Sequence, residues 1–299
     1  MKLHGVRWNK ITLVGVGLLG GSLGLAVKKR RLARQVVGYV RRPASIKESE
    51  KMGAVDHATT NLREAVADAE LIVLCTPIAQ MRALADEMGG ALKPLVVVTD
   101  VGSVKTSVVR ELELVVKRAG GHFVGSHPMA GGEKMGVTAA RHDLFEGAVC
   151  VLTPTKKTNR AALRHVRELW EAVGTQVLRM SPAEHDELVS RSSHLPHVLA
   201  AKLASFVLNP KFPAEQELLC ANGFRDTTRI ASGSPEMWRD IALANRKNLS
   251  VSLGLFIAEL EKFQRSLRKG DEAAIRNFFE YAKTRRDAWA GRIQGVSPE

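Results

Sequence analysis

Short apolar runs alternate with stretches of helical periodicity along the first 180 residues. Strand-length runs rich in Val, Ile and Leu occur at 10–16, 36–40, 71–75 and 95–100, and again at 149–153 and 176–180. Between them, segments such as 18–29, 104–118 and 160–173 repeat apolar residues with the period of an α-helix. This alternation predicts an α/β fold of the Rossmann type, with a doubly wound, mostly parallel sheet and helices on both of its faces.

No convincing strand pattern recurs after Ser181-Pro182. Segments 194–208, 235–244, 246–267 and 271–289 have helical patterns, and Asn209-Pro210 and Gly233-Ser234-Pro235 interrupt them. The change of pattern predicts two domains: a Rossmann-like domain over residues 1–180 and an all-α domain over residues 181–299. The residues from Gly295 onward are expected to be frayed.

Composition places the chain among soluble globular proteins, because 45% of its 299 residues are hydrophobic and 25% are charged. Residues 1–8 lack the apolar core of a signal peptide, and no stretch reaches the roughly 18 apolar residues of a membrane helix. We therefore expect a cytoplasmic protein with no membrane partner. The three cysteines, Cys75, Cys150 and Cys220, fit neither a disulfide framework nor a metal site and are expected to be reduced and buried.

The formal net charge of +13 favours an acidic partner. Nucleic acid is one candidate, but aromatic residues make up only 5% of the chain and do not alternate with the basic ones as a nucleic-acid surface would require. We interpret the charge as a solvated basic surface that also serves small anionic ligands, and we expect no nucleic-acid partner.

A glycine motif, Gly15-Val16-Gly17-Leu18-Leu19-Gly20, lies between the first predicted strand and the first predicted helix. Glycines allow a tight turn and a close approach to a pyrophosphate, and the helix N-terminus offers unpaired N–H groups to the anion. In this strand–helix context the motif predicts a dinucleotide site formed by Gly15, Gly17, Leu18, Leu19 and Gly20. Thr76 and Pro77, which follow the run 71–75, are expected to border the same cofactor.

The end of the second predicted strand favours NADP as the cofactor. An acidic residue usually stands there to bind the ribose hydroxyls of NAD, but Val40 occupies this place and no Asp or Glu occurs before Glu48. Arg41 and Arg42 follow directly, and a guanidinium pairs well with a 2′-phosphate. The alternative is that both arginines are ordinary exposed residues and that NAD binds through backbone contacts.

Two candidate catalytic residues follow neighbouring strands. Ser103, in Asp100-Val101-Gly102-Ser103-Val104-Lys105, falls at the carboxyl edge of the sheet, where open α/β proteins bind ligands. It is also a candidate N-cap of the next helix. His127 lies in a glycine-flanked segment, 125–134, which we expect to be a loop at the same edge. Histidine changes protonation near neutral pH, so His127 is a candidate acid or base beside a nicotinamide.

The helical half carries two further pairs of candidate residues. His194 and His197 are three residues apart and could share a helical face, either for a ligand or for a metal ion, although no third metal ligand accompanies them. Arg225 and Arg229 are four apart, which fits either a carboxylate clamp or a solvent-exposed basic helix.

Taken together, these segments resemble the prephenate dehydrogenase family, which includes the arogenate and cyclohexadienyl dehydrogenases of tyrosine biosynthesis. The likeness covers most of the chain. It is carried by the motifs 15–20, 100–105, Ser126-His127-Pro128-Met129-Ala130-Gly131, Ser193-His194-Leu195-Pro196-His197, 223–231 and Pro235-Glu236-Met237-Trp238-Arg239-Asp240.

The resemblance implies oxidation of the ring hydroxyl of prephenate or arogenate, with hydride transfer to NADP or NAD and loss of the ring carboxylate as carbon dioxide. By this likeness His127 would accept the hydroxyl proton and Ser103 would orient the imidazole and the nicotinamide. Arg229 would hold the ring carboxylate, His197 would lie near the substrate side chain, and His194 and Glu133 would be further contacts at the pocket mouth.

The resemblance also favours a homodimer. Segment 246–267 carries Leu249, Leu253, Phe256, Ile257 and Leu260 at helical spacing, which fits either an internal core or a face that interlocks with a second copy. The all-α domain would then serve substrate binding and dimerisation. The chain leaves no room for the extra mutase or regulatory domains of some relatives, so inhibition by tyrosine would act within the two domains.

Some positions depart from the family pattern. Val40 replaces the usual acid, and Gly132 and Thr227 stand where a Thr and an aromatic residue are expected, which changes the pocket shape. Two alternative functions remain open: a related two-domain dehydrogenase or reductase acting on another small acid, and a non-catalytic dinucleotide sensor. The sensor would need the glycines but not the set Ser103, His127, His197 and Arg229.

Overall fold

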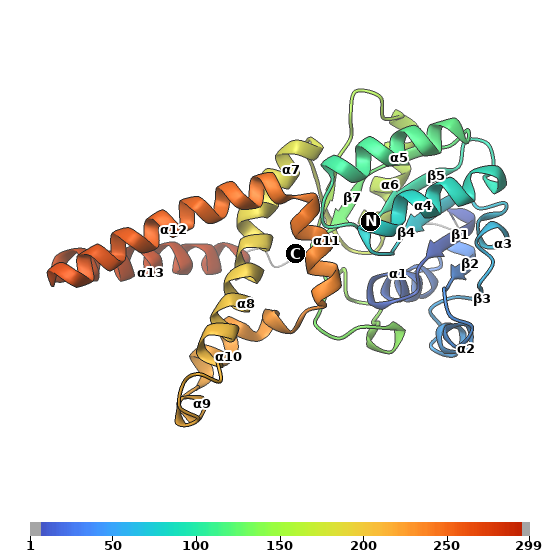
Figure 1. Cartoon of the computed structure of the whole chain (residues 1–299). Helices are drawn as coiled ribbons and strands as arrows, with labels where there is room; N and C mark the ends of the chain where they lie inside the picture. The colour runs from blue at the N-terminus through green and yellow to red at the C-terminus, as the bar shows by residue number, and fades with distance from the viewer. Residues whose placement is uncertain (1–6, 295–299) are drawn as a thin grey trace. The chain divides into compact units, whose positions relative to one another are not determined.

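The structure is a computed structural model that describes residues 7–294; the expectations for the chain start and for the residues from Gly295 concern segments outside this range. Its main element is a six-stranded parallel sheet with the order β3-β2-β1-β4-β5-β6 (Figure 1). The strands are β1 (Trp8–Val14), β2 (Ala33–Tyr39), β3 (His57–Thr59), β4 (Leu71–Leu74), β5 (Val97–Asp100) and β6 (His122–Val124). This order is that of a Rossmann fold, which confirms the predicted fold class of this half.

Helices cover both faces of the sheet because successive strand residues point to opposite sides. On β1, Ile11 and Leu13 join a core with α1 and α6, whereas Val14 joins a second core with α4 and α5. The helices of this half are α1 (Leu18–Lys29), α2 (Ala44–Lys51), α3 (Leu62–Val66), α4 (Ile78–Met88), α5 (Thr106–Arg118) and α6 (Arg160–Ala172).

A second, three-stranded sheet carries the candidate base. It consists of β7 (Ser126–Pro128), β8 (Val149–Leu152) and β9 (Gln176–Arg179), with β7 antiparallel and β9 parallel to β8. The prediction of a loop at His127 was wrong at this point. His127 lies opposite Val151 in the sheet and only 7% of it is exposed, because the pairing with β8 holds the segment as a strand.

A nearly continuous helical rod begins the second half. It runs through α7 (Pro182–Val189), a π-helical turn (Ser190–His194) and α8 (Leu195–Val207); α8 agrees with the helix expected over 194–208, whereas α7 and the π turn were not expected. Pro196 has no N–H to donate to the preceding turn, and the wider π turn accommodates this defect. The short helices α9 (Glu215–Leu218) and α10 (Asn222–Thr228), the 3₁₀ turn Arg229–Ser232 and α11 (Pro235–Ala244) follow.

The chain divides into two compact units, the first ending at Arg246 and the second beginning at Lys247. The second unit is a hairpin of α12 (Arg246–Lys269) and α13 (Glu272–Gln294), in which Phe263 stacks on Phe278 with ring centroids 4.2 Å apart (Figure 1). The all-α second half confirms the rest of the predicted fold class. None of the helices in residues 7–294 has both the length and the apolar character needed to cross a membrane.

The thiols follow the sequence expectation only in part. All three cysteines are free, but only Cys150, in the middle strand β8, is buried. Cys75 and Cys220 are partly exposed, because Cys75 comes after the end of β4 and Cys220 after the end of α9.

Candidate active site

The glycine motif forms a tight turn between β1 and α1. Gly15 has a φ of +99°, and a Cβ atom there would lie 3.0 Å from the Cys75 carbonyl oxygen. A Cβ atom on Gly20 would lie 2.0 Å from the Gly15 carbonyl oxygen, so only glycine fits both positions. Gly17 faces open space, and no side chain caps the helix that begins after it. The turn therefore presents free N–H groups to a ligand, as a pyrophosphate requires.

The neighbouring residues fit a dinucleotide as well. Thr76 lies against Gly15, and its hydroxyl oxygen is buried without a hydrogen-bond partner among residues 7–294. Leu18 and Leu19 are half-buried and pack on the core, and Pro77 is exposed beside Thr76. An open cradle of backbone N–H groups with an orphaned hydroxyl at its side is the arrangement that a bound nucleotide would complete.

The two arginines after β2 are free to reach a ligand. β2 ends at Tyr39, Val40 is buried, and both Arg41 and Arg42 are exposed. In the described part of the chain, neither guanidinium forms an ion pair.

His127 lies in a buried cluster of ionisable side chains. Its Nδ1 atom lies 2.8 Å from Nε2 of His185, which α7 supplies. Burial holds the pKa of His127 well below its usual value, and the nearby His185, Lys105 and His194 lower it further. The imidazole is therefore neutral at physiological pH, the state that a proton acceptor needs.

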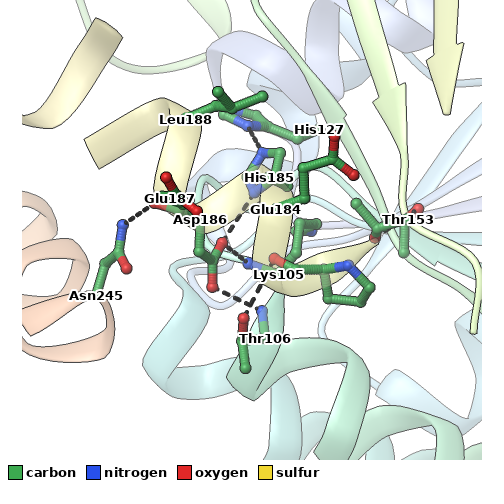
Figure 2. Close-up of polar contacts among 12 residues, drawn as sticks. Lys105, Thr106, His127, Thr153, Glu184, His185, Asp186, Glu187, Leu188 and Asn245 are labelled. Carbon is green, nitrogen blue, oxygen red and sulfur yellow. Dashed lines mark hydrogen bonds and ion pairs between the residues drawn. The ribbon is translucent and has the colours of Figure 1, made fainter. Parts of the chain in front are cut away.

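Asp186 completes a chain of three side chains that starts at His127 (Figure 2). Nδ1 of His185 lies 2.8 Å from Oδ1 of Asp186. The same carboxylate accepts the backbone N–H groups of Lys105 and Thr106, at 2.7 and 2.8 Å. Burial by itself would raise the pKa of Asp186, but the hydrogen bonds from His185, Thr106 and Lys105 outweigh it and lower the pKa. Asp186 is therefore a buried carboxylate held in the ionised form.

These contacts correct one expectation for Ser103. Helix α5 begins at Thr106, and its first N–H groups are bound by Asp186 rather than by a Ser103 N-cap. The backbone of Ser103 instead lies beside the imidazole of His194. Ser103 thus belongs to the loop between β5 and α5, and this loop lies against the helical rod at His194.

A buried ion pair fixes the strand that carries His127. Lys105 and Asp100 pair with each other, and both side chains are completely buried. Asp100 accepts the backbone N–H of Ser126 at 3.1 Å, and Lys105 donates to the Ser126 carbonyl at 2.8 Å. The residue before His127 is therefore held through both of its backbone polar groups.

The two histidines of the helical rod face different partners. His194, the last residue of the π turn, is buried, and its Nδ1 lies 3.1 Å from Nδ2 of Asn245. Its Nε2 has no hydrogen-bond partner among residues 7–294. Burial lowers the pKa of His194 to about 4, although the nearby Asp186 opposes this shift.

His197 is half-buried, and its Nδ1 donates to the Ser193 carbonyl at 3.0 Å. Its ring stacks on Trp238 with centroids 3.7 Å apart, and burial lowers its pKa. Gly233 leaves room for this indole, because a Cβ atom there would lie 2.7 Å from Nε1 of Trp238.

Arg229 and Glu133, both predicted substrate contacts, form an ion pair with each other. Arg229 lies in the 3₁₀ turn after α10, and its side chain is 63% exposed. Arg225 pairs instead with the neighbouring Asp226, so the two arginines do not act as one clamp. Within residues 7–294 no cluster of His, Cys, Asp and Glu side chains is arranged to hold a metal ion.

Sequence reasoning did not identify His185, Asp186, Lys105, Asp100 and Trp238 as parts of this cluster. Lys105 and Asp100 stood inside a recognised motif, and a Lys and an Asp in a buried strand–loop segment need each other as partners. The pair His185-Asp186 gave no such signal, because it stands in no recognised motif and lies before the first helix predicted for this half, which began at residue 194.

Comparisons with known proteins agree with this architecture. Residues 23–179 match the family described as prephenate dehydrogenase, nucleotide-binding domain, and residues 181–284 match prephenate dehydrogenase, dimerization domain. The prephenate dehydrogenase of Bacillus subtilis is 35% identical over 96% of this chain and 78% of the relative.

Two solved structures are similar over nearly their whole length. The Aquifex aeolicus prephenate dehydrogenase, solved with hydroxyphenyl propionate and NAD+, has a TM-score of 0.86 and 32% identity, covering 96% of this chain and all of that one (100%). Synechocystis arogenate dehydrogenase has a TM-score of 0.78 and 30% identity, covering 94% and 99% of the two chains. With both halves matched in order and a curated relative at this identity, the chain belongs to the prephenate dehydrogenase family.

Proposed function

We propose that this protein oxidises the ring hydroxyl of prephenate or arogenate, with loss of the ring carboxylate, to give 4-hydroxyphenylpyruvate or tyrosine. The observation that carries the proposal is the buried, neutral imidazole of His127 at the carboxyl edge of β5. Ligands of open α/β sheets bind at this edge. The named activities of the relatives support the same reaction class.

The proton of the substrate hydroxyl would pass to His127 as the ring carbon becomes a carbonyl carbon. A bound nicotinamide supplies the acceptor for the hydride that leaves this carbon. The bond between the ring and its carboxylate then breaks, carbon dioxide leaves, and the electron pair completes the aromatic ring. Aromatisation drives the reaction forward, so the protein needs mainly to position the substrate and to accept one proton.

Arg229 would hold the ring carboxylate through charge-assisted hydrogen bonds. In the structure it is paired with Glu133, so a substrate carboxylate would take the place of the Glu133 carboxylate. His197, stacked on Trp238, and the buried His194 would line the part of the pocket that takes the substrate side chain. Ser103 would contact the nicotinamide from the loop after β5.

We infer that NADP is preferred over NAD. The turn at 15–20, the N-terminus of α1 and Thr76 would hold the nucleotide, with Pro77 beside them. Arg41 and Arg42 are exposed and form no ion pair in the described part of the chain, so their guanidinium groups would be able to pair with a 2′-phosphate. The Aquifex aeolicus relative was solved with NAD+, so the preference is proposed for this chain from its own residues.

We also propose a homodimer formed through the helical half. The family segment that matches residues 181–284 is described as a dimerization domain. The hairpin of α12 and α13 exposes large apolar residues, among them Leu255, Leu260, Phe279 and Tyr281. Light scattering at micromolar concentration is expected to give the mass of a dimer, and a monomer would contradict this assembly.

The central experiment assays the purified chain with NADP and NAD, each with prephenate and with arogenate, by following cofactor reduction. We expect turnover in at least one NADP reaction, and the substrate that gives the higher kcat/KM identifies the preferred side chain. Adding tyrosine to the active reaction tests inhibition within the two domains. If none of the four combinations supports turnover, the proposed function is wrong.

A further inference from the structure

The buried row of hydrogen-bonded side chains His127, His185 and Asp186 determines which ring nitrogen of each histidine carries a proton. A neutral imidazole has a proton on one ring nitrogen and a lone pair on the other, so it can donate at one atom and accept at the other. Two imidazoles and one carboxylate in a row therefore have few consistent arrangements. The carboxylate at the end of this row decides among these arrangements.

Asp186 is that end, and it acts only as an acceptor. Its two carboxylate oxygens accept the backbone N–H groups of Lys105 and Thr106, which begin helix α5, and these bonds favour the ionised form. Nδ1 of His185 lies 2.8 Å from the carboxylate and must carry a proton, because an unprotonated nitrogen would place two lone pairs against each other in a buried site.

The proton position on His185 then determines the proton position on His127. With its proton on Nδ1, a neutral His185 presents a lone pair on Nε2. Nδ1 of His127, 2.8 Å away, must therefore donate. We propose that His185 and Asp186 are positioning residues that hold His127 in the tautomer with Nδ1 protonated and Nε2 unprotonated. Its catalytic meaning, though not the tautomer itself, rests on the proposed function.

This tautomer gives His127 the lone pair that the reaction needs. Nε2 is the atom left to accept the substrate proton, and the positive charge that then forms is shared through Nδ1–H with His185 and Asp186. The neighbouring Lys105 and His194 oppose that charge. The carboxylate of Asp186 thus offsets them in the place where the cation forms. A similar arrangement, in which a buried Asp fixes the tautomer of a catalytic His, operates in serine proteases.

Nitrogen-15 NMR of the full chain labelled at histidine tests the tautomer directly, without substrate or cofactor. We expect His127, assigned by comparison with His127→Asn, to show a protonated Nδ1 and an unprotonated Nε2 at neutral pH. In His185→Phe no partner holds the proton on Nδ1, and we expect a signal from Nε2–H to appear. A wild-type His127 protonated on Nε2 overturns the proposal, including the arrangement in which His185 is a cation paired with Asp186.

Kinetics test whether the tautomer matters for turnover. We expect His185→Phe and Asp186→Asn to lower kcat by about 100-fold or more, with KM changed by less than about threefold. His185→Gln should retain more activity, because a glutamine amide can accept from His127 and donate to Asp186. Glu184→Gln, which removes an exposed carboxylate from the same helix turn, is the control and should keep the wild-type kcat.

The outcomes separate this proposal from the proposed function. Asp186→Asn also weakens the cap of α5, so the His185 variants carry the test if that protein unfolds. If NMR shows the expected tautomer but the protein turns over none of the substrates, the proposed function is wrong and the proposed proton positions on His127 and His185 stand. Equal kcat values for His185→Phe, His185→Gln and the wild-type chain would overturn the positioning role.

Discussion

Arg229 and Glu133 form an ion pair that joins the turn after α10 to the segment after β7. Both side chains are partly exposed, so the pair is screened by water and contributes little to stability. It nevertheless places the guanidinium at Glu133, in the segment that follows the strand of His127. Under the proposed function, a substrate carboxylate would replace that of Glu133 at the Arg229 guanidinium.

Replacing Arg229 with Ala is expected to weaken substrate binding more than turnover. A hydrogen bond between charged groups contributes about 1.5–3 kcal/mol, which corresponds to a roughly 10- to 100-fold rise in KM. Steady-state kinetics at saturating cofactor measure the effect. Arg167→Ala removes another exposed arginine that is paired with a glutamate and should leave KM unchanged.

For His127→Asn we expect a larger effect on kcat than on KM, the opposite of the result expected for Arg229→Ala. The asparagine retains polarity but cannot take the hydroxyl proton, so kcat should fall by about 10²- to 10⁴-fold while KM changes little. His122→Asn, in the neighbouring strand β6, serves as the control. A variant at position 127 that keeps near-normal kcat would remove His127 from the mechanism.

The glycine motif offers a pair of substitutions with different expected results. In Gly20→Ala the added methyl group meets the Gly15 carbonyl oxygen, so we expect a loss of about 1–3 kcal/mol in stability together with weaker cofactor binding. In Gly17→Ala the methyl group enters open space, so stability should be kept while cofactor affinity falls. Thermal unfolding and cofactor titration distinguish the two, and equal melting temperatures would contradict the packing argument.

Cofactor choice is expected to depend on Arg41. If its guanidinium pairs with the 2′-phosphate, Arg41→Ala should lower kcat/KM for NADP by about 10- to 100-fold and leave that for NAD nearly unchanged. Arg34→Ala removes an exposed arginine near the opposite end of β2 and is the matched control. A wild-type preference for NAD that Arg41→Ala does not alter would show that the assignment to NADP is wrong.

Acid is expected to destabilise the protein through His194. Burial in the folded chain lowers the pKa of His194 to about 4, with Asp186 and the Ser103 backbone opposing this shift and His185 and His197 adding to it, whereas in the unfolded chain the histidine protonates near 6.5. Between these values the unfolded state binds more protons, so the free energy of unfolding should decrease as the pH falls from 6.5 towards 4. Denaturant unfolding should show a flatter pH dependence for His194→Gln and an unchanged one for exposed His165→Gln.

The periodicity of the sequence was sufficient for most of the fold. It located α1 and α11 at their observed bounds, because an apolar stripe and clear flanking glycine or proline residues define both helices. It placed the first strand, 10–16, two residues too late at both ends; at the C-terminal end Val16 extends the apolar run although Gly15 already turns the backbone. β7 could not be predicted from three residues, Ser126-His127-Pro128, whose pairing with β8 is a tertiary event.

In the candidate site, too, the sequence indicated the residues that stand in local motifs and missed those defined by contacts distant in sequence. Motifs made His127, Ser103, Arg229 and the glycines candidates, because each stands in a local pattern with a physical purpose. His185 and Asp186 take their meaning only from contacts with His127 and with the start of α5, far away in the chain. Such contacts depend on how α7 packs against β7 and the start of α5, and the spacing of hydrophobic residues in the sequence does not predict that packing.

The placement of Asp186 has a consequence for rebuilding this protein from parts. The nucleotide-binding family segment ends at residue 179, so a chimera that transplants this segment would carry His127 without His185 or Asp186. The transplanted α5 would lose the carboxylate that binds its first N–H groups, and the imidazole would lose its neighbour at Nδ1. An exchange of the cofactor module of this protein should therefore place its junction beyond helix α7.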